Sequence, residues 1–187
     1  MFLHYWRGIP IGYLTRDPTA VAGVQAYIGF FSQLGIFFWA GAAAVCFLAA
    51  AILTQHAESS ETRKFLIVSG LMTLFLSFDD VFLLHEEVFP YFGIPENVVV
   101  LSYPGFVLLY LFRFRFLILS TEYMLLATAL FFFAVSFVLD FYKPPQLDRY
   151  LYEDGAKLTG IIAWMTYFFR VGMLAARRMV ALRVPNS

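Results

Sequence analysis

The sequence SFDDVFLLHEE at residues 77–87 places five ionisable side chains at the end of a long apolar run. These side chains are Asp79, Asp80, His85, Glu86 and Glu87. The run begins at Phe65 and is long enough to enter a membrane. A carboxylate in hydrocarbon costs roughly 2.5–3.5 kcal/mol on insertion scales, so it is normally retained where it faces a partner, water or an ion. We therefore expect a site at this end of the run.

The composition predicts an integral membrane protein. Of 187 residues, 61% are hydrophobic and only 14% are charged, whereas a soluble domain carries about 25% charged residues. The net charge is zero, which argues against nucleic acid as a partner and leaves membrane lipids as the expected surroundings. The single cysteine, Cys46, lies within an apolar run and cannot form an intrachain disulfide.

Apolar segments predict an all-α bundle of five transmembrane helices in a single domain, residues 1–187. The predicted spans are residues 26–54, 65–88, 97–112, 123–141 and 156–176. About 20 helical residues are needed to cross ~30 Å of hydrocarbon. The third segment is short and contains Pro104 and Gly105, so it either extends through residues 113–116 or fails to span, which would leave four spans.

The first 25 residues contain Pro10, Gly12 and Pro18 and are expected to form an irregular segment. Its aromatic residues, including Trp6, are of the type found at membrane interfaces.

Basic residues are distributed unequally between the two sides of a five-span topology. Eight lie on one side: Arg63, Lys64, Arg113, Arg115, Arg170, Arg177, Arg178 and Arg183. The other side has Arg7, Arg16, Lys143, Arg149 and Lys157. Because cytoplasmic loops are enriched in Lys and Arg, this pattern predicts an external N-terminus and a cytoplasmic C-terminus, in a bacterial inner membrane or an equivalent membrane.

The same topology brings polar residues from four segments to the outer end of the bundle. The candidate metal ligands are Asp79, Asp80, His85, Glu86, Asp140 and Glu153. The candidate supporting residues are Gln33, Ser77, Asp154 and Lys157. Carboxylates suit a hard cation such as Ca²⁺, and a histidine would admit a transition metal.

Helical geometry refines this prediction if residues 65–88 form one continuous helix. At about 100° per residue, the four carboxylates of residues 79–87 share a broad face, and His85 points away from it. Ser69, Thr73 and Ser77 continue this polar face toward the membrane centre.

Structural roles are the alternative for each of these residues. Glu86 and Glu87 would be solvated outside the membrane, and Glu153 would pair with Lys157 four residues later. Asp140 would pair with Lys143 or Arg149 at the end of its helix. The same bases, Arg149 and Lys157, are the possible partners of Asp79 and Asp80 from other segments.

Three functions follow from these observations. The first is cation binding for ion passage or sensing, in a homo-oligomer. The second is a metal-dependent hydrolase acting on lipid within the membrane. The third is a non-catalytic subunit of a larger membrane complex. The Glu-x-x-His and His-Glu-x-x-His motifs are absent, and no haem is expected because the chain has only three histidines.

Overall fold

The computed structural model describes residues 2–53, 60–142 and 148–183, and within these ranges it contains helices and no strand. The long helices are α4 (Phe30–Ile52), α5 (Ser60–Phe82), α7 (Glu96–Leu119), α8 (Tyr123–Tyr142) and α9 (Arg149–Arg183). Each is long and apolar enough to cross a membrane, α9 over Tyr150–Arg177. The prediction of five membrane-spanning helices is therefore supported by length and composition.

The predicted helix boundaries need correction. The bounds 97–112 of the third predicted segment are too short, and the alternative in which it extends through residues 113–116 is confirmed, because α7 continues to Leu119. Pro104 lies inside α7 without ending it. Because α7 is long and apolar enough to cross a membrane, the four-span alternative is unnecessary. The fifth helix begins at Arg149 and not at residue 156.

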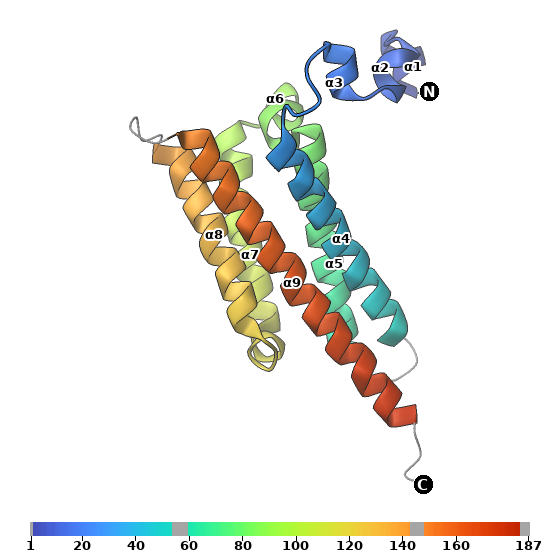
Figure 1. Cartoon of the computed structure of the whole chain (residues 1–187), viewed down its shortest axis with the longest axis vertical. Helices are drawn as coiled ribbons and strands as arrows, with labels where there is room; N and C mark the ends of the chain where they lie inside the picture. The colour runs from blue at the N-terminus through green and yellow to red at the C-terminus, as the bar shows by residue number, and fades with distance from the viewer. Residues whose placement is uncertain (1, 54–59, 143–147, 184–187) are drawn as a thin grey trace.

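The N-terminal segment is more regular than predicted. It forms three short helices, α1 (Phe2–Arg7), α2 (Ile11–Thr15) and α3 (Pro18–Ala22), separated by bends that include Gly8 and Pro10. These helices lie beyond one end of the bundle (Figure 1). Their exposed aromatic residues, among them Tyr5 and Trp6, are consistent with an interfacial position, which remains a prediction.

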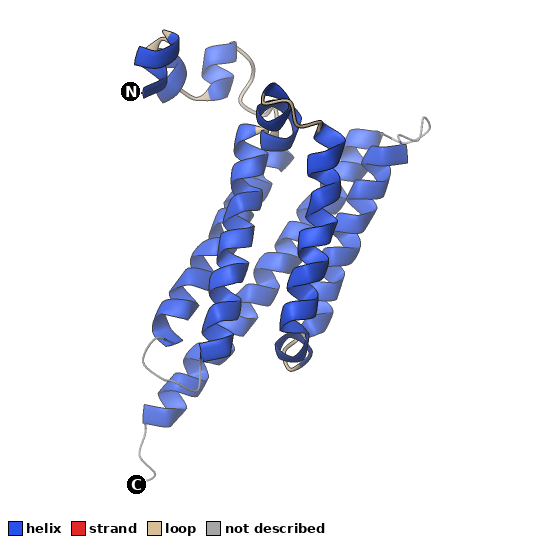
Figure 2. Ribbon diagram, turned by 180° about the vertical axis from the view of Figure 1, so that it is seen from behind, coloured by secondary structure: helices blue, strands red, loops and turns tan. Residues whose placement is uncertain are grey.

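Consecutive long helices run antiparallel, so α4 and α9 run in the same direction (Figures 1 and 2). Helix α4 packs directly against both α5 and α9, and α8 packs against α9. Small residues permit this close approach: a Cβ at Gly172 of α9 would lie 3.3 Å from the Cβ of Ala49 in α4. In contrast, α7 meets α5 through large side chains. The ring centroids of Phe65 in α5 and Tyr110 in α7 are 5.8 Å apart.

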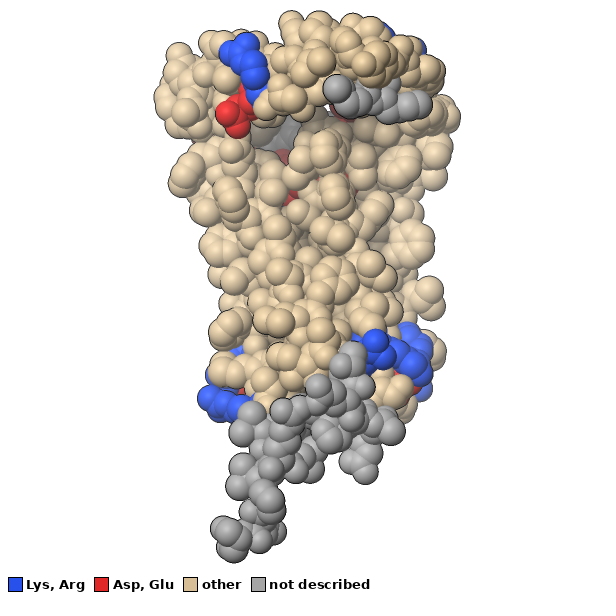
Figure 3. Space-filling model, turned by 90° about the vertical axis from the view of Figure 1, so that its right-hand side faces the viewer, with Lys and Arg blue, Asp and Glu red and all other residues tan. Residues whose placement is uncertain are grey.

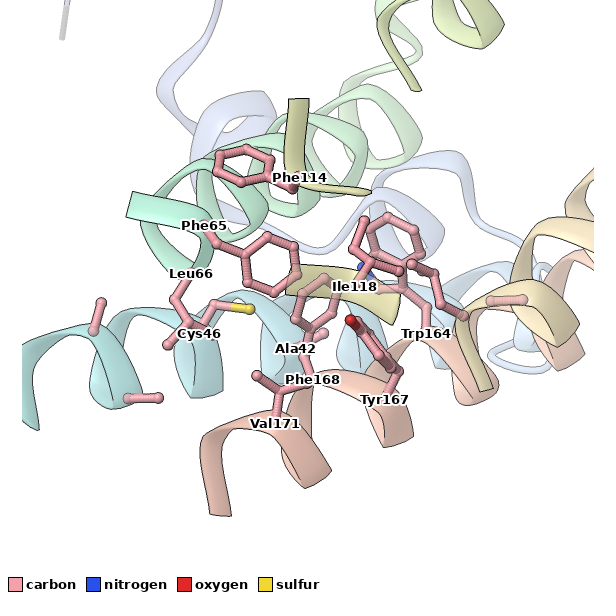
Figure 4. Close-up of a cluster of buried hydrophobic side chains, with 14 of the residues drawn as sticks. Ala42, Cys46, Phe65, Leu66, Phe114, Ile118, Trp164, Tyr167, Phe168 and Val171 are labelled. Atoms are coloured by element: carbon pink, nitrogen blue, oxygen red, sulfur yellow. The ribbon is translucent and has the colours of Figure 1, made fainter. Parts of the chain in front are cut away.

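Buried aromatic rings form the centre of the bundle (Figure 4). Phe65 is fully buried and also contacts Phe114 of α7 and Phe168 of α9, with centroid distances of 5.2 and 5.9 Å. Trp164 contacts Phe168 at 5.1 Å. Such offset and edge-to-face pairs add about 0.5–1.5 kcal/mol each beyond burial of area. They join α5, α7 and α9 in one core.

The end of α5 differs from the prediction in a way that determines the site. The helix ends at Phe82, and the prediction of a continuous helix to residue 88 is wrong. Leu83 has the left-handed conformation, with φ of 50°, and is followed by a π-helical turn, η3 (Leu84–Val88), and by α6 (Phe89–Tyr91). A left-handed leucine is unusual, because this conformation favours glycine.

Charged groups separate toward the two ends of the bundle. On the face shown in Figure 3, Lys and Arg side chains gather mainly at the lower end, and others lie at the upper end, in one place beside acidic atoms. Acidic atoms are visible inside a hollow near the upper end. The helix order places the starts of α5 and α8 at the basic end, as the topology predicted. The orientation in a membrane remains a prediction.

The contact between α8 and α9 should be sensitive to volume at Gly160. A Cβ at this position would lie 2.7 Å from the ring of Phe133 and 3.2 Å from the carbonyl oxygen of Ala129. We expect Gly160→Ala to lower the free energy of unfolding by about 1–3 kcal/mol through overpacking. Thermal unfolding in detergent measures this, with Gly105→Ala as control because no atom lies within 4 Å there. Equal stability of the two variants would contradict the packing described.

Candidate functional site

Asp80 connects three helices through its carboxylate. Its Oδ1 accepts a hydrogen bond from Nζ of Lys157 in α9 at 2.6 Å, and its Oδ2 accepts one from Nε1 of Trp39 in α4 at 3.0 Å. The Asp80 side chain is 9% exposed and that of Lys157 is 41% exposed. Both oxygens of a nearly buried carboxylate are thus satisfied by side chains from neighbouring helices. This bears out the predicted alternative in which Lys157 pairs with an α5 carboxylate.

Asp79, the adjacent residue, pairs with His85. Its Oδ2 lies 2.7 Å from Nδ1 of His85, and its Oδ1 accepts a hydrogen bond from the backbone N–H of His85 at 3.0 Å. The Asp79 side chain is 4% exposed and that of His85 is 20% exposed. The other ring nitrogen, Nε2, lies 3.5 Å from Oε1 of Glu86. Asp79 therefore holds both the main chain and the ring of His85.

The predicted orientation of His85 away from the acidic face is wrong. That prediction assumed a straight α-helix, whereas the left-handed Leu83 and the π-helical turn return His85 toward Asp79. The same break separates Glu86 and Glu87 from the face of Asp79, and both are exposed, as the structural alternative proposed. No glycine or proline marks the break in the sequence, so residue patterns gave no signal for it.

The pKa of His85 is raised above its ordinary value. The main cause is the hydrogen bond to Asp79, which stabilises the imidazolium. Burial acts in the opposite direction, and the negative charges of Asp79 and Glu86 add to the increase. Lys157, a nearby positive charge, reduces it slightly.

Tyr103 of α7 completes this side of the site and was not predicted from the sequence. Its ring packs edge-to-face with that of His85, at a centroid distance of 6.2 Å. Its hydroxyl is buried and lies close to the carboxylate of Asp79. Trp39 was also missed, since an aromatic residue in an apolar run gives no indication of a polar role.

A small polar cavity adjoins the Asp80–Lys157 pair. Its volume is about 30 Å³, and Asp154 and Gly35 also line it. This is the space of roughly one water molecule. Of the predicted supporting residues, Asp154 and Lys157 therefore lie beside Asp80, whereas Gln33 is exposed.

The predicted polar stripe below the acids has a structural role. The Ser69 hydroxyl lies 2.7 Å from that of Tyr110 in α7, and Thr73 accepts a 2.9 Å hydrogen bond from Nε1 of Trp164 in α9. Ser77 is buried above them. Two of the three hydroxyls thus join α5 to its neighbours.

The structure does not support the predicted metal site. In the described ranges, no three His, Cys, Asp or Glu side chains are grouped so that they could hold a metal ion. Asp140 and Glu153 are half-buried near the adjoining ends of α8 and α9. The proposed pairing of Asp140 with Lys143 falls outside the described residues, as does the side chain of Arg149.

The two partners of the Asp80–Lys157 pair should contribute to stability as a coupled unit. We expect Asp80→Asn or Lys157→Met alone to lower the free energy of unfolding by about 1–3 kcal/mol, below the usual range for buried pairs because Lys157 is partly exposed. The double variant should lose less than the two single losses combined. Thermal unfolding in detergent measures this cycle, with Glu87→Gln as control. Additive losses would show that the pair is not coupled.

Comparisons with known proteins give one match. No protein of curated function and no solved structure matches the chain. The family model described as a domain of unknown function, DUF8692, matches residues 1–171. The match includes every helix of the site, from α4 to most of α9. The chain belongs to the DUF8692 family.

Proposed function

We propose that the protein is a proton-responsive membrane protein whose sensing group is the His85–Asp79 pair. The observation that supports this proposal is that two adjacent carboxylates at the end of α5 each hold a different base, His85 and Lys157. Histidine is the side chain whose charge changes most readily near neutral pH. The neighbouring Lys157, paired with Asp80, supplies a fixed charge beside His85, which titrates.

A proton fits this site better than a metal ion. Each oxygen of Asp79 already accepts a hydrogen bond from His85, and the oxygens of Asp80 accept from Trp39 and Lys157. Ca²⁺ requires six to eight oxygen ligands, and binding one here would displace bonds that compensate buried charge. We therefore propose that the cation taken up at this site is a proton.

Sensing fits the packing better than ion passage. Directly below the charged pairs, Trp39 and Trp164 are both buried and pack edge-to-face at 6.0 Å. Trp39 also stacks on Phe133 at 5.5 Å. This aromatic layer joins α4, α8 and α9, and the hydroxyls of α5 below it are bonded to Tyr110 and Trp164. We therefore propose that a change of charge at the outer end of the bundle acts on the adjacent connection between α5 and α7.

The segment that responds is the connection between α5 and α7. At low pH His85 is charged, and its bonds to Asp79 hold the π-helical turn against the end of α5. Because the pKa of His85 is raised, this stabilisation is complete below the ordinary value of about 6.5 and is lost as pH rises through the raised value. A left-handed Leu83 adds strain that favours release.

We expect the pKa of His85 to exceed 6.5 in the wild-type protein and to fall in Asp79→Asn, since the variant removes the charge that stabilises the imidazolium. Nitrogen-15 NMR of histidine-labelled protein in nanodiscs measures this, and His85→Gln assigns the signal among three histidines. The protection factors of the amides of residues 83–95, which correct for the intrinsic rise of hydrogen exchange with pH, should be higher at pH 5 than at pH 8.

Glu87→Gln serves as the control, because Glu87 is exposed in the same turn. It should leave both the titration of His85 and the protection factors unchanged, whereas His85→Gln should abolish the pH dependence of the protection factors. A His85 pKa below 6.5, or protection factors that do not vary with pH, would overturn the proposed function.

A further inference from the structure

A long apolar groove lies between α5 and α7, separate from the charged pairs. Its volume is about 730 Å³, within the range of ligand pockets. Its walls include Val68 and Leu71 of α5 and Phe106 and Leu109 of α7. The rings that separate the two helices, such as the stacked Phe65 and Tyr110, keep the groove open.

The groove has the length of one membrane leaflet. Along α5 it extends from Lys64 to Leu76, which at 1.5 Å per residue is about 18 Å. This is near half of the ~30 Å hydrocarbon thickness. Tyr103 closes the end nearest the His85–Asp79 pair, and the opposite end opens between Lys64 and Arg113.

The open end carries a charge suited to a phosphodiester. Lys64 Nζ lies 2.9 Å from Oε1 of Glu61, and Arg113 lies 3.0 Å from the other oxygen of the same carboxylate. These three groups leave one net positive charge, and all three side chains are more than half exposed. Guanidinium and ammonium groups bind phosphate oxygens through charge-assisted hydrogen bonds.

We propose that the α5–α7 groove binds one anionic phospholipid, with an acyl chain between the helices and its phosphate at Lys64 and Arg113. The apolar walls match a single chain from one leaflet, and the net charge at the open end matches one phosphodiester. The site lies at the end of the bundle where most of the basic residues are, which is where the headgroups of the predicted cytoplasmic leaflet would be.

The adjacent leucines of α7 provide a matched test. Leu109 lines the groove and Leu108 does not, yet they are 65% and 66% exposed. We expect Leu109→Trp to weaken binding of phosphatidylglycerol to delipidated protein in detergent at least tenfold, and Leu108→Trp to leave it unchanged. Val68→Trp fills the groove from the opposite wall and should act like Leu109→Trp. Native mass spectrometry counts the bound lipid, and thermal unfolding verifies that each variant is folded.

Charge variants test the headgroup end. Arg113→Gln should remove the preference for phosphatidylglycerol over phosphatidylcholine, whereas Arg115→Gln should retain it because Arg115 does not line the groove. Equal binding by Leu108→Trp and Leu109→Trp would overturn the proposal. A dimer that Leu109→Trp dissociates would also overturn it, because a second copy would then occupy the groove.

Discussion

The loss of hydration at Asp79 and Asp80 is the constraint on which the outer end of this protein depends. Two adjacent carboxylates, 4% and 9% exposed, need compensation at separate positions because their side chains leave α5 in different directions. Lys157 and Trp39 satisfy one and connect α9 and α4 to α5. His85 satisfies the other only because α5 ends at Phe82 and the chain turns back.

This local requirement accounts for the least regular part of the backbone. A leucine at φ of 50° and a π-helical turn are both uncommon, and such conformations persist when the surrounding structure determines them. Here the two hydrogen bonds from His85 to Asp79 hold the turn in this conformation. Strain and a titratable bond therefore occur in the same turn, which is why protonation is proposed to act on this connection and not on the packed helices below.

Much of the fold could be predicted from the sequence. Hydropathy alone indicated the five long helices, and the alternation of their direction placed Asp80, Asp154 and Lys157 at one end. The extent of α7 was underestimated because Arg113 and Arg115 end the apolar run, although arginines near the end of a membrane helix can extend their charge to the interface. From the sequence, exposed positions for Glu86 and Glu87 could be given only as an alternative, because these positions depend on where α5 ends.

What the sequence determined by itself is the class of structure and the presence of costly charges near one end, because both follow from composition and from distance along a helix. Only the tertiary structure decided which groups compensate those charges. Pairing of Asp79 with His85 requires a backbone break without a glycine signal, and the role of Trp39 requires α4 and α5 to lie side by side. The first contact is close in sequence but needs a strained backbone conformation that residue patterns do not report, and the second joins residues that are distant in sequence.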